Sequence, residues 1–152
     1  MAERAHEDAR AALERLARRV RNELTAAGLP VVAPDLAPEL MVGAEVTVAS
    51  EADNGAVFVS WNASPQLRRK ALDALRHRHL NDPALQHQGT VLAAMARATI
   101  AILTAAGFTA QDAENDMSPF DVRILDGPGS NTEPAWAMRA DDLTLPGGSS
   151  TT

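Results

Sequence analysis

Apolar residues recur every three or four positions through the first 27 residues, which is the spacing of one face of an α-helix. Acidic residues stand near the start of this segment, where the helix dipole favours them. Gly28 is suited to the left-handed conformation that ends many helices, and Pro30 prevents continuation. The pattern predicts a first helix from about Glu3 to Ala27. Its buried stripe should consist of Leu13, Leu16, Val20 and Leu24.

The next segment changes to the period of two that is typical of β-strands. Val31-Val32 is a short apolar run and is predicted as a first strand. Residues 44–49 alternate apolar and polar positions, and residues 56–62 place three large apolar side chains on one face. Between them, Asp53-Asn54-Gly55 supplies residues that tolerate the positive φ of tight turns. The sequence therefore predicts a β-hairpin here.

Two helix start signals follow, each a capping residue before proline. Ser64-Pro65 predicts a second helix that runs to about His79, and Asp82-Pro83 predicts a short helical turn interrupted by Gly89. A third helix is expected from about Thr90 to Ala106. The stretch from Val91 to Phe108 contains Arg97 and many alanines, so it is interpreted as a buried helix and not a membrane span. The residues expected to face inward are Leu67, Ala71, Leu72 and Leu75, then Leu92, Met95, Thr99, Ile102 and Leu103.

After Gly107 the signals are shorter. Thr109 and Asp112 resemble the capping box of another short helix. Phe120, Val122 and Ile124 alternate with polar residues and predict a further strand. From residue 127 onward Gly, Pro, Ser, Thr and Asn dominate, which is typical of a tail. Two apolar pairs interrupt that tail, namely Trp136 with Met138 and Leu143 with Leu145.

These elements predict an α+β fold in the order α-β-β-β-α-α-β. A small antiparallel sheet of three or four strands should carry its helices on one face. Residues 1–126 are expected to form one domain, and residues 127–152 a Gly/Pro/Ser-rich tail that is partly docked around Trp136. A length of 152 residues and a hydrophobic content of 45% suit such a domain.

The charge pattern narrows the function classes. The net charge is −6, which argues mildly against nucleic acid or an anionic membrane as the main partner. Residues 31–63 carry five acids and no base, whereas residues 64–98 carry six bases and two acids. The absence of cysteine excludes disulfides, thiol catalysis and Cys-ligated metals. The N-terminus has no apolar segment of a secretory signal, so we expect a cytoplasmic protein.

The strongest cationic feature is a cluster in the second predicted helix. Its candidate partner-binding residues are Arg68, Arg69, Arg76 and Arg78, next to Lys70. Together with Arg15, Arg18 and Arg19 of the first helix they could form a surface for a phosphate backbone. The commoner cause of such a cluster is a solvated helix exterior, and that interpretation is favoured.

Catalytic and metal-binding patterns are weak. On a helix, His77 and His79 would point about 200° apart and could not share one ion. His79, Asp82 and His87 are the least implausible polar constellation, but they match no known zinc spacing. The Gly-rich segment 127–130 lacks the lysine of a phosphate-binding loop. We therefore predict no metal, no cofactor and no catalytic residue.

Trp136 and Met138 are the remaining candidates for partner binding. A large aromatic side chain in a polar tail needs an apolar contact. It either docks on its own domain, which we favour, or anchors a partner.

The preferred hypothesis is a non-catalytic cytoplasmic protein-binding module from a bacterium: an adaptor, or a chaperone-like or antitoxin/immunity-like protein. We expect it to bind a protein partner, to self-associate as a homodimer, or both, and not to bind a membrane. Two alternatives stay open. One is a nucleoid-type DNA-binding protein that uses the Arg-rich helices. The other is a small enzyme or ligand carrier with a pocket between helices and sheet.

Overall fold

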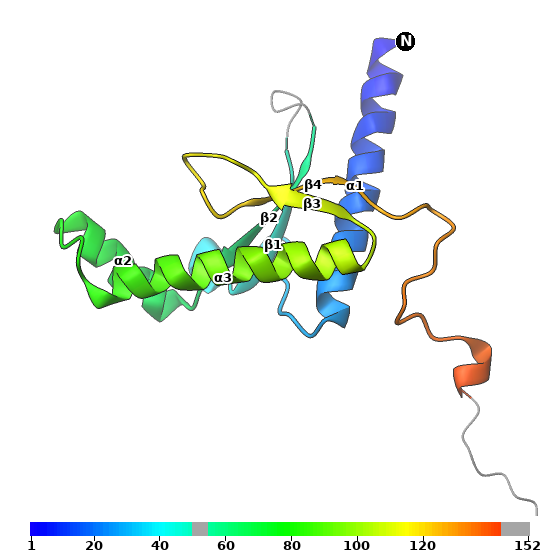
Figure 1. Ribbon diagram of the computed structural model, residues 1–152. Helices are drawn as coiled ribbons and strands as arrows, with labels where there is room; N and C mark the ends of the chain where they lie inside the picture. The colour runs from blue at the N-terminus through cyan, green and yellow to red at the C-terminus, as the bar shows by residue number, and fades with distance from the viewer. Residues whose placement is uncertain (50–54, 144–152) are drawn as a thin grey trace, which may run out of the picture.

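The computed structural model describes residues 1–49 and 55–143, and these form an α+β fold in the order α-β-β-α-α-β-β (Figure 1). Asp53 and Asn54 of the predicted turn, and Leu145 with the rest of 144–152, lie outside the described residues. The elements are α1 (Ala2–Ala26), η1 (Pro38–Leu40), β1 (Gly43–Val48), β2 (Val57–Asn62), α2 (Pro65–Arg76), α3 (Pro83–Ala105), β3 (Thr109–Asp112), β4 (Val122–Asp126) and η3 (Ala140–Leu143).

The sheet is antiparallel throughout, in the order β1-β2-β4-β3. Val46 pairs with Val59 across β1 and β2, and Val59 pairs in turn with Val122 of β4. Because side chains alternate along a strand, one register places all these valines on one face. Every member of this apolar row is buried. The predicted hairpin and the predicted strand around Val122 and Ile124 are therefore confirmed.

Both long helices cover this buried face. α1 packs on β1 and β2 through Val20 and Leu24, which are fully buried, while α3 packs on β2, β3 and β4. Leu103 of α3 belongs to the same core as the α1 side chains. The predicted arrangement, with helices on one face of a small antiparallel sheet, is confirmed.

The predicted order was wrong at two places. Val31 makes only an isolated parallel bridge with Ala44, because Pro30 and Pro34 bound the segment and leave it too few donors for a strand. Residues Thr109–Asp112 form β3, not a helix. Their backbone groups pair with β4, and the Asp112 carboxylate accepts a hydrogen bond from the Glu114 N–H at 2.7 Å in a local turn. Long-range pairing overrode the local capping signal.

The central helices also differ from their predicted boundaries. α3 is one helix of 23 residues that starts at Pro83 and passes through Gly89. Its N-cap is Asp82, whose carboxylate accepts the Ala84 N–H at 2.9 Å. A helical glycine costs only about 1 kcal/mol, which the packing of α2 on α3 can offset. α2 ends at Arg76 and not at His79, because Arg78 takes a left-handed φ of 56°.

The inward face of α2 was predicted correctly at Ala71 but wrongly at Leu72 and Leu75. Ala71 and Ala74 are buried, whereas Leu72 and Leu75 are 45% and 53% exposed. α2 packs against α3, and its small alanine side chains permit close approach of the two helices. The helix is therefore rotated so that two leucines point away from the packed interface.

α3 is also less buried than predicted. Within it only Thr99 and Leu103 are buried. Figure 1 shows why: the helix crosses the sheet near its C-terminal end, while α2 and the first half of α3 extend beyond the sheet to one side. The overhanging half has α2 as its neighbour, so its apolar side chains are partly and not fully buried.

Candidate functional site

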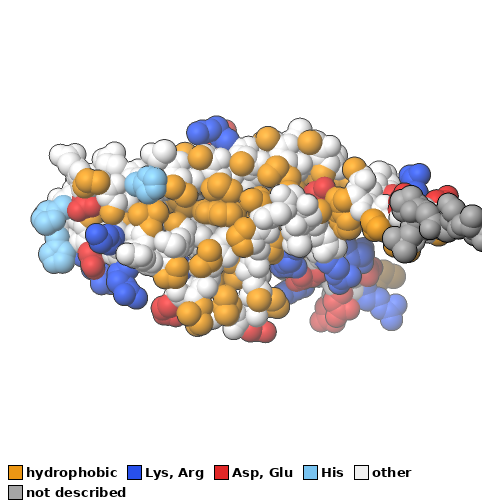
Figure 2. All heavy atoms as spheres, turned by 90° about the horizontal axis from the view of Figure 1, so that it is seen from below, with side chains coloured by type: hydrophobic (Ala, Val, Ile, Leu, Met, Phe, Trp, Pro, Cys, Tyr) orange, Lys and Arg blue, Asp and Glu red, His pale blue; other side chains and the backbone are white. Residues whose placement is uncertain are grey.

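The most unusual surface of the molecule is the apolar side of α3. Among the described residues, α3 is the one helix whose length and composition would let it cross a membrane, and only 11% of its most apolar 18-residue window is buried. Figure 2 shows hydrophobic side chains gathered along this side of the molecule, with charged side chains mainly toward its margins. The large apolar side chains of α3 are buried or partly buried, and its exposed positions are mainly alanines and polar residues.

The outer face of α3 is formed by small side chains around one charge. At about 100° per residue, Ala94, Arg97, Ala101 and Thr104 point away from the buried Thr99 and Leu103, and all four are exposed. Partly buried apolar residues flank this face, namely Val91, Met95, Ala98 and Ile102, of which Ile102 packs against the core. Such a face could accept a second helix at close range. Sequence reasoning missed it, although the single arginine in the apolar run was a signal that one side faces solvent.

A second exposed apolar area lies on α2 and η1. Leu72 and Leu75 of α2 are exposed, and so is Leu40 of η1. Arg68 connects the two elements, because its guanidinium donates hydrogen bonds to the carbonyls of Met41 at 2.7 Å and Pro38 at 3.1 Å. Its Nε is buried without a partner. Arg68, the first of the predicted site residues, therefore holds the loop around η1 by these hydrogen bonds.

The other predicted basic residues are placed separately. Arg69 and Arg76 are exposed on α2, and Arg78 lies just past its end. On α1, the Arg19 guanidinium stacks 5.8 Å from the centre of the Phe108 ring, and Arg21 of the same helix is likewise turned toward the domain. Figure 1 places α2 and α1 at opposite sides of the sheet. The structure does not bring the two predicted arginine groups together.

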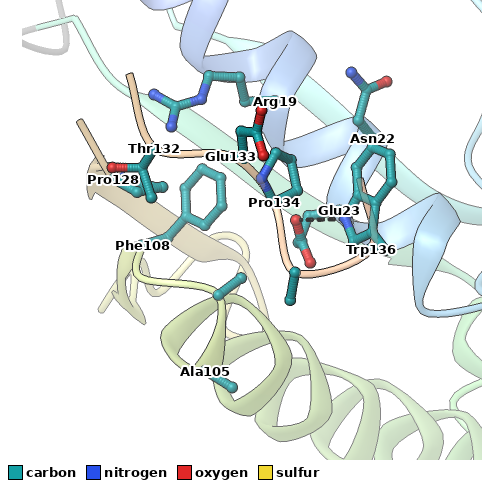
Figure 3. A pocket seen from close by; sticks show the side chains of 12 residues that line it. Arg19, Asn22, Glu23, Ala105, Phe108, Pro128, Thr132, Glu133, Pro134 and Trp136 are labelled. Atoms are coloured by element: carbon teal, nitrogen blue, oxygen red, sulfur yellow. Dashed lines mark hydrogen bonds between the residues drawn. The ribbon is translucent and has the colours of Figure 1, made fainter. Parts of the chain in front are cut away.

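Trp136 lies against the end of α1. Its indole N–H donates a hydrogen bond to the Glu23 carboxylate at 2.9 Å, and 45% of the residue remains exposed (Figure 3). The tail around it closes one side of a cavity of about 290 Å³. Arg19 and Phe108 form the opposite wall. Met138, the other predicted tail residue, is 70% exposed and is not among the residues that line this cavity.

Two of the four histidines, His77 and His79, lie at the turn between α2 and α3. The rings of His77 and His79 lie 6.0 Å apart, so the prediction that they point apart was wrong. It assumed a continuous helix, whereas the chain turns at Arg78. His79 and Asp82 line an open recess of about 460 Å³, but His87 does not. Within residues 1–49 and 55–143, no three metal-ligating side chains are placed to hold an ion.

One ionisable group has a shifted pKa. Burial raises the pKa of the Asp121 carboxyl above its ordinary value, and the nearby Glu45 carboxylate raises it further. Asp121 directly precedes the buried Val122, so alternation places its side chain on the sheet face opposite the core. Asp121 and Glu45 therefore form a pair of neighbouring carboxyl groups on this sheet face.

The chain matches no protein-family model, no curated protein and no solved structure.

Proposed function

We propose that this protein is a non-catalytic, cytoplasmic protein-binding module that docks a partner on the outer face of α3. The observation that carries this proposal is the low burial of α3: only two of its 23 residues are fully buried, and its exposed positions are mainly alanines and polar residues. Burial of apolar area drives most protein association, and a helix left in this state supplies such area without any conformational change.

The chemistry of the face favours a protein partner that presents an apolar helix. Ala94 and Ala101 are seven residues apart and lie on the same side of α3, so another helix backbone could approach closely. Arg97 lies between them. An arginine at the centre of a bilayer costs about 2.5–3.5 kcal/mol, whereas at a protein interface it can pair with a carboxylate or carbonyl. A protein partner is therefore favoured over a lipid surface.

The alternative functions gain less support from the geometry. A DNA-binding surface needs a continuous run of cations, but the arginines of α1 and α2 lie on opposite sides of the sheet. A small enzyme or ligand carrier built on His79, Asp82 and His87 needs convergence of all three side chains. Only the first two line the same recess.

Site-specific photo-crosslinking in native cells tests the proposal. A photoreactive residue would replace Ala94 or Ala101, with the same residue at Gln111 as the control, because Gln111 is exposed on β3. We expect one adduct of defined mass at both helix positions and not at the control. Adduct formation should be lost when the other alanine is also changed to glutamate. Equal labelling at all three positions would refute the proposal, and so would flotation of the purified chain with phosphatidylglycerol vesicles but no protein adduct.

A further inference from the structure

Three exposed leucines lie on the two elements that Arg68 connects, and we call them the leucine strip. It consists of Leu40, Leu72 and Leu75, which are 63%, 45% and 53% exposed. Arg68 lies one helical turn before Leu72 and donates hydrogen bonds to carbonyls within and next to η1. η1 is therefore held beside the same side of α2 that carries Leu72 and Leu75. This surface differs from the outer face of α3 and does not depend on the function proposed for that face.

The leucine strip is bordered by opposite charges. Around α2, Leu72 separates Arg68 and Leu75 on one side from Arg69 and Arg76 on the other. The side toward Arg68 carries η1 and its loop, where Asp35 and Glu39 are exposed. No ion pair within residues 1–49 and 55–143 involves Asp35, Glu39, Arg69 or Arg76. With Arg68 counted beside Asp35 and Glu39, and Asp73 beside Arg69 and Arg76, the first border has a net charge of −1 and the second a net charge of +1.

We propose that a second copy of this chain docks on the leucine strip in a two-fold symmetric dimer. In such a dimer each surface meets the same surface rotated by 180°, so the strip packs on the strip. When the two-fold axis runs parallel to α2, the rotation also sets the acidic border of one copy, with Glu39, against the basic border of the other, with Arg69 and Arg76. A partner of uniform charge could satisfy only one border. The arrangement of charges therefore selects a second copy as the occupant.

The size of the strip sets the expected affinity. α2 has 12 residues and is therefore about 18 Å long. A surface of that length and about one helix diameter (~10 Å) in width is smaller than the ~800 Å² per partner that standard stable complexes bury. We expect a dissociation constant in the micromolar range, which should rise with salt because the borders are solvent-exposed.

Sedimentation velocity over ~1 to ~200 µM protein at low salt tests the apolar centre. Leu72→Asp should weaken the dimer at least ~30-fold, the effect of removing an interface hot spot. Met117→Asp is the matched control, because Met117 is 90% exposed in the loop before β4 and should leave the constant unchanged. Circular dichroism verifies that both variants are folded, and Leu75→Asp serves if Leu72→Asp is not. A monomer at every concentration, or a dimer unaffected by both leucine changes, overturns the proposal.

Charge reversal tests the two-fold arrangement. Glu39→Arg makes both borders basic, and Arg76→Glu makes the second border less basic and adds an acid opposite Glu39. Each variant alone should dimerise at least ~10-fold more weakly than the native chain. An equimolar mixture of the two should dimerise like the native chain, because the reversed borders then oppose each other with complementary charges. A mixture as weak as its components would overturn the proposal and would leave the crosslinking result on α3 untouched.

Discussion

Arg68→Ala should destabilise the fold by about 2 kcal/mol, although Arg68 looks like an ordinary surface base in the sequence. Its bond to the Met41 carbonyl is short and partly buried, and such a bond from a charged donor contributes ~1.5–3 kcal/mol. The bond to Pro38 is solvent-exposed and adds ~0.5 kcal/mol or less. The buried, unpaired Nε opposes these gains by ~1 kcal/mol, and that cost disappears with the side chain.

Urea unfolding monitored by circular dichroism measures this effect, at a protein concentration well below the expected dimer constant. Arg69→Ala is the matched control, because Arg69 is the exposed neighbour on the same helix and its loss should change stability by less than ~0.5 kcal/mol. Arg68→Lys should recover only part of the loss, since an ammonium cannot reproduce the planar fork of donors. Equal unfolding midpoints for Arg68→Ala and Arg69→Ala would refute the conclusion that Arg68 holds the η1 loop.

Three further predictions concern single positions. Arg78→Gly should raise the free energy of unfolding by about 1 kcal/mol in a urea titration, because Arg78 occupies a left-handed conformation that costs a non-glycine residue about that much. Asp121→Asn should stabilise the fold at neutral pH and lose this benefit toward pH 3.8. Because the pKa of Asp121 is raised in the folded state, the native chain binds the proton more tightly, and its stability falls as the pH rises from the ordinary pKa through the raised pKa. Unfolding midpoints of both chains measured across that pH range test this prediction. Trp136→Ala should lower the free energy of unfolding by about 1 kcal/mol, because the indole is hydrogen-bonded to Glu23 but half-exposed. It should also remove a fluorescence contribution that acrylamide quenches readily. A loss above ~3 kcal/mol would show that the tail is part of the core.

The exposed surfaces of α2 and of the tail around Trp136 could be predicted only in part from the sequence. The basic residues of α2 and the pair Trp136 and Met138 stood out by composition, but their neighbours did not. Leu72 and Leu75 were expected to face inward together with Leu67 and Ala71. The structure turned them outward because the alanine face of α2 packs on α3. Which side of an amphipathic helix meets its neighbour depends on the neighbour, which a periodicity cannot specify.

The sequence alone determined the helices and strands that have one regularly spaced apolar face. The apolar stripe of α1, the alternation of β1 and β2, and the alternation around Val122 each required one buried face, and each formed where the pattern placed it. Tertiary structure alone decided β3, the continuity of α3 through Gly89, and the exposure of the α2 leucines. At those positions the intrinsic preferences amount to about 1 kcal/mol or less per residue. Hydrogen bonding to β4 and packing between α2 and α3 involve many residues at once, so contacts distant in the sequence outweighed the local signals.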